Sequence, residues 1–192
     1  LSFRPEAPVP EVSCGKAAVY GDGPIRVALP DYGVKNNIIR SLTRRGCTVK
    51  RFPYDASFEE MMEFSPDGIM LTNGPGDPKD CKKSIAELKK VYASGIPTFA
   101  ICLGHQLMAL AQGFDTYKLK YGHRGINHPG DTVDPSIADI RFVSMNDGSI
   151  EGLTYKNGKV FSVQFHPEAS PGPLDTGFLF VKFIGVMGGS RL

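Results

Sequence analysis

A single cysteine, Cys102, stands where an apolar stretch gives way to a glycine-containing turn and then to a helical pattern, in FAICLGHQLMAL. In an open parallel sheet, ligands bind beyond the carboxyl ends of the strands, and a strand is predicted to end here. The start of the following helix favours the thiolate, the reactive form of cysteine. The segment therefore predicts a nucleophile elbow, in which we expect Gly104 to let the turn pass close under a substrate. Taken alone, it is equally typical of a small buried core residue.

A histidine and a glutamate follow another predicted strand, in FSVQFHPEAS. A thiol nucleophile needs a general base, and the base needs a third group that fixes its tautomer and ring orientation. His166 can take the proton of Cys102, and Glu168 points to the same side of an extended chain and can accept a hydrogen bond from the imidazole. The tripeptide HPE alone is also typical of a polar turn. Paired with the cysteine, it predicts a triad of Cys102, His166 and Glu168.

The stretch TNGPGDP, residues 72–78, follows a third apolar strand. Two glycines around a proline form a rigid turn with exposed backbone amides, which suits an oxyanion hole. The spacing does not match that of a phosphate-binding P-loop or of a dinucleotide fingerprint. In isolation the stretch is also consistent with an ordinary loop. The remaining candidate near the thiol, His105, is interpreted as structural.

The composition favours a folded domain that binds neither nucleic acid nor membrane. The chain has 192 residues, of which 41% are hydrophobic and 22% charged, and a formal charge of +2. Basic residues cluster in RRGCTVKR and KKSIAELKK, but each cluster is typical of a solvated face. No apolar run is long enough to span a membrane, and no signal peptide is visible. The four cysteines show no metal-binding spacing, so we expect free thiols, no metal and a cytoplasmic location.

Strand and helix patterns alternate through the first part of the chain, which predicts parallel strands joined by crossover helices. Strands are predicted at 25–30, 47–53, 67–73 and 97–101, and helices at 33–46, 57–64, 81–95 and 105–113. Later strands at 116–122, 139–145 and 159–165 lack intervening helices, and a helix closes the chain at 173–187. We therefore predict an α/β fold: an open, mostly parallel sheet with flanking helices and an antiparallel extension in the C-terminal half.

The first 24 residues are rich in proline and glycine, in RPEAPVPEVSCG and GDGP. A stretch with so many prolines and glycines is not expected to sustain a helix or a central strand. Residues 1–24 are therefore interpreted as a linker or as the remnant of a missing N-terminal domain, and residues 25–192 as the functional domain.

The motifs CLGHQ, NGPGDP and FHPEASPGP, in this order, resemble those of the class I (triad) glutamine amidotransferases. Within that family, DYGVKNNIIR, GHRGINHP and NDGSIEG look most like the small, glutamine-hydrolysing subunits of carbamoyl-phosphate synthetases. The resemblance covers about Ile25 to Met187. It implies that residues 25–192 hydrolyse L-glutamine to glutamate and ammonia, and that the ammonia passes to a large synthetase subunit. ATP and Mg²⁺ are then expected only on that partner, with no cofactor in this chain.

Carried over position by position, the resemblance implies that Cys102 attacks the side-chain amide of glutamine. His166 would act as base and then as acid for the leaving ammonia, and Glu168 would orient it. The remaining implied roles are the oxyanion hole, formed by the backbone amides of Gly74 and Leu103, and substrate binding, by Gly76 and Gln106.

Two departures from the family pattern bear on activity. Ala100 replaces a usual glycine two residues before the nucleophile, where its methyl group could crowd the elbow or the pocket. A stretch with an S-Q-N-H-G core, expected to contact glutamine, is missing after Pro129, either by deletion or because the sequence omits a disordered loop. Two alternatives therefore stay open: another cysteine hydrolase acting on γ-glutamyl substrates, or a non-catalytic docking subunit.

Overall fold

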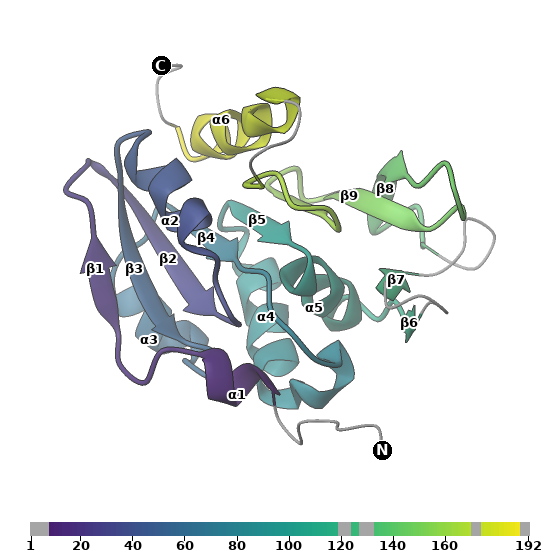
Figure 1. The fold of residues 1–192 in the computed structure, drawn as a ribbon, viewed down its shortest axis with the longest axis horizontal. Helices are drawn as coiled ribbons and strands as arrows, with labels where there is room; N and C mark the ends of the chain where they lie inside the picture. The colour runs from purple at the N-terminus through teal and green to yellow at the C-terminus, as the bar shows by residue number, and fades with distance from the viewer. Residues whose placement is uncertain (1–7, 119–123, 127–132, 170–173, 189–192) are drawn as a thin grey trace.

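A mixed β-sheet with helices on both faces forms the fold (Figure 1). The computed structural model describes residues 8–118, 124–126, 133–169 and 174–188. Within these residues, ten strands join one sheet. In chain order they are β1 (Ala18–Tyr20), β2 (Ile25–Asp31), β3 (Cys47–Pro53), β4 (Gly68–Leu71), β5 (Thr98–Ile101), β6 (Thr116–Lys118), β7 (Arg124–Ile126), β8 (Ala138–Val143), β9 (Ile150–Tyr155) and β10 (Val160–Val163).

The sheet has a parallel centre and antiparallel ends. The strand order is β1-β3-β2-β4-β5-β10-β9-β7-β6, and β8 pairs with β9 beside this path. All pairs from β3 to β10 are parallel, whereas β1 and the strands beyond β10 pair antiparallel. The predicted fold class, with an antiparallel extension in the C-terminal half, is confirmed. Because β4, β5 and β10 are parallel neighbours, their carboxyl ends lie together at one edge of the sheet.

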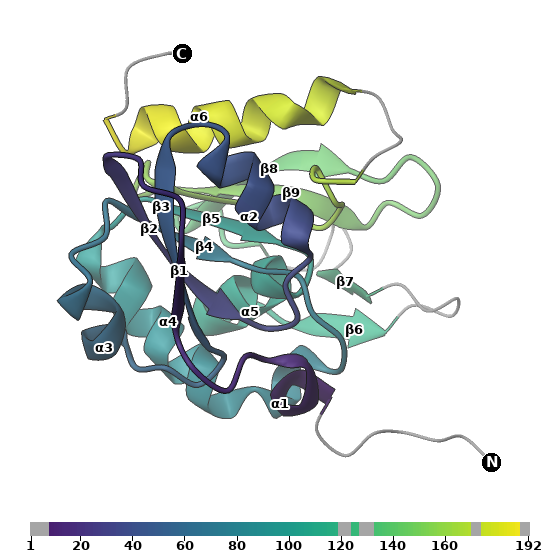
Figure 2. The same ribbon diagram turned by 60° about the vertical axis from the view of Figure 1, so that its left-hand side comes forward.

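Six α-helices are described, and five of them cover the two faces of the sheet. They are α1 (Pro8–Val12), α2 (Asn36–Thr43), α3 (Phe58–Glu63), α4 (Lys82–Ser94), α5 (Leu103–Ala111) and α6 (Phe178–Val186). Short 3₁₀ turns precede α4 and α6, at Pro78–Asp80 and Leu174–Gly177. Helices α3, α4 and α5 lie on one face, and α2 and α6 lie on the other (Figures 1 and 2).

Side-chain alternation along the buried strands supplies a separate hydrophobic core to each face. In β5, Phe99 and Ile101 pack into the core beneath α2 and α6, whereas Ala100 packs into the core beneath α5. The Phe99 ring stacks on Phe161 of β10 with centroids 4.5 Å apart, and Phe180 of α6 contacts Phe99 edge-on at 5.7 Å. This aromatic cluster fixes β5 and β10 relative to each other, and these two strands carry Cys102 and His166.

The N-terminal stretch differs from the expectation for residues 1–24. Residues 8–12 form a one-turn helix, α1, so the expectation that no helix forms here is wrong. Two prolines fit this helix because one occupies its first position, where no intrahelical N–H is needed. Val9 is buried in the core, and β1 adds an antiparallel edge to β3. The backbone N–H of Cys14 donates to Asp31 at 2.7 Å, which joins this stretch to the end of β2.

Two strands of the extension, β7 and β9, were not expected from the sequence. Strand β9 contains Gly152, which interrupts the alternating pattern and accommodates the ring of Phe142 from β8. No helix among the described residues is long and apolar enough to cross a membrane.

Candidate active site

Cys102 lies at a sharp turn between β5 and α5, as the sequence predicts for a nucleophile elbow. Its backbone has φ 54° and ψ −106°, a positive-φ conformation that costs a non-glycine residue on the order of 1–3 kcal/mol. Its N–H donates to the carbonyl oxygen of Val163 at 2.8 Å, which ties the turn to the end of β10. Helix α5 begins at Leu103, two residues earlier than the sequence pattern indicated. The thiol therefore stands at the helix N-terminus, where the backbone favours negative charge.

Gly104 has a different role from the one expected. A Cβ at this position would lie 2.7 Å from both the Cβ and the carbonyl oxygen of Leu71 in β4. The backbone N–H of Gly104 also donates to the carbonyl oxygen of Thr72 at 3.0 Å. The glycine therefore lets α5 pack against the end of β4, rather than letting the turn approach a substrate.

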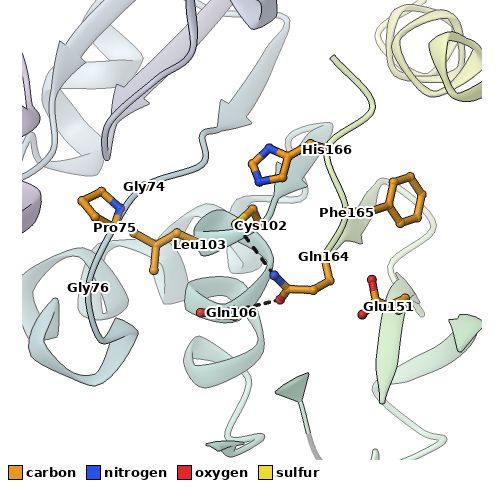
Figure 3. Close-up of a pocket in the computed structure, with 10 residues that line it drawn as sticks. All are labelled: Gly74, Pro75, Gly76, Cys102, Leu103, Gln106, Glu151, Gln164, Phe165 and His166. Atoms are coloured by element: carbon orange, nitrogen blue, oxygen red, sulfur yellow. Dashed lines mark hydrogen bonds between the residues drawn. The ribbon is translucent and has the colours of Figure 1, made fainter. Parts of the chain in front are cut away.

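The loop after β4 brings Gly74 beside the thiol (Figure 3). A Cβ at Gly74 would lie 2.0 Å from the carbonyl oxygen of Tyr32, so only glycine fits here without a shift of the backbone. Side chains of the same loop hold it against the residues that follow β2. Asn73 accepts from the N–H of Lys35 at 3.1 Å, and Thr72 accepts from the N–H of Tyr32 at 2.9 Å.

Gly74 and Leu103 both line the cavity described below, and no hydrogen bond from their backbone amides is found among the described residues. Two such amides near a nucleophile are the arrangement that stabilises negative charge on a carbonyl oxygen. The structure brings these two predicted positions together at the edge of one cavity.

His166 follows β10 and lies above Cys102 (Figure 3). Its Nδ1 lies 2.7 Å from Oε1 of Glu168, whose side chain is fully buried. The hydrogen bonds of His166 with Cys102 and with Glu168 raise its pKa to about 9. Burial alone would raise the pKa of Glu168, but its bond with His166 and the nearby positive charges hold that pKa below its ordinary value. At neutral pH, the imidazolium of His166 thus lies beside the carboxylate of Glu168 and the sulfur of Cys102.

Two residues at the start of α2, Lys35 and Asn37, lie against the histidine segment. The ammonium of Lys35 lies 3.2 Å from Nδ1 of His166 and 3.6 Å from Oε1 of Glu168. The side-chain amide of Asn37 donates to the backbone oxygen of Glu168 at 3.1 Å. Sequence reasoning did not connect these residues with the histidine segment, since each lies 131 positions away from the residue it contacts.

A cavity of about 480 Å³ opens above the thiol, a size typical of small-molecule sites. Six of the seven predicted site residues line it, and Glu168 lies behind His166. The described lining residues are Gly74, Pro75, Gly76, Cys102, Leu103, Gln106, Glu151, Gln164, Phe165 and His166.

The family model for class I glutamine amidotransferases matches residues 28–134 and 130–186, most of the chain. The chain belongs to this family. Among curated relatives, the carbamoyl phosphate synthase small chain of Listeria monocytogenes is 44% identical over 205 residues, covering 95% of this chain and 56% of the relative. The small chain of Clostridium perfringens is 46% identical over 187 residues, covering 88% of this chain and 53% of the relative. The chain thus spans about half the length of these relatives.

Solved structures show the same fold at low sequence identity. A putative GMP synthase component from Thermoplasma acidophilum superposes with a TM-score of 0.72 at 19% identity, covering 88% of this chain and 96% of that one. A glutamine amidotransferase from Thermotoga maritima gives a TM-score of 0.56 at 18% identity, covering 84% and 82%. These similarities agree with the amidotransferase fold.

Gln164 is a residue of the amidotransferase site that sequence reasoning missed. Its Nε2 lies 3.7 Å from the sulfur of Cys102, and its Oε1 accepts from Nε2 of Gln106 at 2.8 Å (Figure 3). Gln106 therefore reaches the thiol region through Gln164. The available signal was a polar residue directly after the apolar run of β10, because polar residues that follow buried strands mark the edge of the sheet where sites form.

The other cysteines and His105 lie outside the cavity. All four thiols are free, and burial raises the pKa of Cys47 and of Cys81 to about 11. His105 is fully buried, and its Nδ1 lies 2.7 Å from the hydroxyl of Ser162. Burial lowers the pKa of His105 to about 3, so it stays neutral and structural, as expected. Within the described residues, no group of three His, Cys, Asp or Glu side chains could hold a metal ion.

The two departures from the family pattern fall in different places. Ala100 is fully buried in the core beneath α5 and is not among the described residues that line the cavity. The junction after Pro129 lies in residues 127–132, outside the described part of the chain.

Proposed function

We propose that this amidotransferase domain hydrolyses L-glutamine to glutamate and ammonia through a γ-glutamyl thioester on Cys102. The observation that carries the proposal is the convergence of three strand ends. Neighbouring strands β4, β5 and β10 bring Gly74, Cys102 and His166 to one cavity. A thiol, a charged imidazole and two unpartnered amides are the groups that cysteine-dependent acyl transfer requires.

In the first half-reaction, His166 has taken the proton of Cys102, and the resulting thiolate sulfur attacks the side-chain amide carbon of glutamine. The carbonyl oxygen becomes an oxyanion, which the amides of Gly74 and Leu103 stabilise by hydrogen bonds. The imidazolium of His166 then gives its proton to the amide nitrogen, the C–N bond breaks and ammonia leaves. A thioester between Cys102 and the glutamyl group remains.

In the second half-reaction, the now neutral His166 takes a proton from water as the water oxygen attacks the thioester carbon. The same amides hold the second oxyanion, and the C–S bond breaks to release glutamate. The thiolate and the imidazolium are restored. Glu168 keeps Nδ1 of the imidazole protonated, so that Nε2 faces the reacting atoms in both steps. Gly76 and Gln106 line the cavity and hold the substrate.

The ammonia goes to the large subunit of a carbamoyl-phosphate synthetase, in the cytoplasm. The support is the similarity to relatives named as the small chains of that enzyme. The chemistry of ATP, Mg²⁺ and bicarbonate belongs to the partner subunit, and carbamoyl phosphate supplies arginine or pyrimidine synthesis. Since released ammonia is wasted, we expect slow hydrolysis by the isolated chain and faster hydrolysis with the partner bound.

The test is release of ammonia from L-glutamine, with and without a large subunit of carbamoyl-phosphate synthetase. We expect release that requires Cys102 and that rises when the large subunit is added. A Cys102→Ala variant serves as the control for contaminating glutaminase. Equal rates for this variant and the unmodified chain would contradict the proposal, and so would a complex that forms but releases no ammonia.

A further inference from the structure

Glu151 brings a carboxylate into the cavity from the antiparallel extension of the sheet. It lies in β9, and its side chain points toward Gln164 (Figure 3). Its backbone oxygen accepts from the N–H of Gln164 at 2.9 Å, so the two residues are held side by side. The hydroxyl of Ser149, which is 1% exposed, lies 3.4 Å from Oε1 of Glu151.

The two walls of the cavity have opposite chemistry. On one side, Gly74, Pro75 and Gly76 form the wall, and the two glycines bring backbone N–H groups to it (Figure 3). On the other side, Glu151 presents the one carboxylate among the described lining residues. A ligand that carries both an anionic and a cationic group fits such a pair of walls, because each charge then meets a complementary partner.

We propose, on the basis of the proposed function, that Glu151 binds the α-ammonium group of glutamine and selects for substrates that carry it. The reacting amide of glutamine must reach Cys102, which leaves its α-carbon end to contact the rest of the cavity. There the α-carboxylate meets the amide of Gly76 on the donor wall, and the α-ammonium meets Glu151 on the acceptor wall. An ammonium that leaves water needs such an anionic partner, or its desolvation opposes binding.

A purely structural role for the carboxylate is the alternative, since Ser149 lies within reach of it. The two roles differ in what they predict for substrate choice. Loss of a structural contact weakens the reaction of every substrate, whereas loss of an ammonium partner weakens only the reaction of substrates that have an ammonium.

The experiment compares two reagents that alkylate a nucleophilic cysteine: the diazoketone analogue of L-glutamine and the same diazoketone without the α-amino group. Rates of labelling at Cys102 are measured by peptide mass spectrometry for the unmodified chain, Glu151→Gln and Glu151→Asp. Asp139→Asn is the matched control, because it removes an exposed carboxylate from the neighbouring strand β8, outside the cavity.

We expect the unmodified chain and Asp139→Asn to react with the amino reagent about 10- to 100-fold faster than with the other, as for loss of one charge-assisted hydrogen bond. In Glu151→Gln this ratio should fall to near one, because labelling by the amino reagent slows while labelling by the other reagent keeps its rate. Glu151→Asp should keep part of the ratio. An unchanged ratio in Glu151→Gln, or an equal loss of rate with both reagents, would overturn the role of Glu151. If neither reagent labels Cys102 of the unmodified chain in preference to Cys14, Cys47 and Cys81, the proposed function itself fails.

Discussion

Cys102 and His166 reach the same cavity by different means. The backbone holds Cys102: its own turn is bonded to the end of β10 through Val163, and the first turn of α5 packs on β4 through Gly104. Side chains hold His166, whose imidazole contacts Glu168 and Lys35 and remains 31% exposed. The nucleophile is thus positioned by the core of the fold, whereas the base is positioned by contacts that single substitutions can remove. Changes near the two residues should therefore have different signatures.

The largest effect is expected from removing the base itself. In His166→Asn, the leaving ammonia and the attacking water lose their proton carrier, and glutaminase kcat should fall about 10²- to 10⁴-fold. The free energy of unfolding at pH 8 should fall as well, because the buried carboxylate of Glu168 loses its hydrogen-bond partner. Steady-state ammonia release and urea unfolding measure the two quantities. A variant that retains more than half of the activity would remove His166 from the mechanism.

A change in the backbone support should affect stability and activity together. In Gly104→Ala, the added methyl group meets Leu71 at 2.7 Å, and overpacking of this kind costs about 1–3 kcal/mol of unfolding free energy. A shift of the elbow by about 1 Å can also lower the rate about 100-fold. Gly185→Ala is the control, because nothing lies within 4 Å of a Cβ at that position in α6. If Gly104→Ala retained both full stability and full activity, α5 would not be fixed by this contact.

Removal of the carboxylate behind the base should change the pH dependence of both activity and stability. In Glu168→Gln, loss of the charge-assisted bond to His166 should lower kcat about 10- to 100-fold. The pKa of His166, about 9 in the intact site, should also fall toward its ordinary value. Because catalysis starts from the imidazolium, the alkaline limb of the kcat/KM profile should move to lower pH. An alkaline limb that stays near pH 9 would contradict this assignment.

The same shift has a consequence for stability. The pKa of His166 is raised from 6.5 in the unfolded chain to about 9 in the folded one. Its contribution is therefore fully present below pH about 6.5 and is lost as the pH rises through about 9. Comparing unfolding free energies at pH 6 and pH 9.5, the difference between the intact chain and Glu168→Gln should be larger at pH 6.

The smallest effect is expected at Ala100. Its methyl group packs in the core and not against the cavity, so Ala100→Gly should leave kcat/KM unchanged. Loss of the buried methyl and the added freedom of glycine should lower the unfolding free energy by about 1–2 kcal/mol. A clear rise in kcat/KM would instead show that the methyl group crowds the elbow.

The parallel half of the fold and the proximity of Cys102 and His166 were predictable from sequence for one physical reason. Strands such as β4 and β5 are buried on both faces, so they stand out as short apolar runs, and the polar residues that follow them mark their carboxyl ends. Cys102 and His166 are such residues. Parallel topology then requires the ends to lie at one edge of the sheet.

The residues that sequence reasoning missed depend on long-range pairing. Lys35 and Asn37 meet the histidine segment only because β2 and β10 belong to the same sheet. Glu151 enters the cavity only because β9 pairs antiparallel with β10, and the pattern of β9 is broken by Gly152. No local sequence pattern in these segments predicts their contacts with the site. The contacts follow only from the strand order of the sheet.

The central claim is that Cys102 carries the glutamyl group during turnover. The most direct test is acid quenching of the chain during reaction with L-glutamine, in complex with the large subunit, followed by peptide mass spectrometry. We predict a mass increase of one glutamyl group on the peptide that contains Cys102, and no adduct on Cys14, Cys47 or Cys81. His166→Asn should prolong the adduct if it forms, and Cys102→Ala should abolish both adduct and ammonia. Continued ammonia release by Cys102→Ala, or an adduct on another cysteine, would contradict the account.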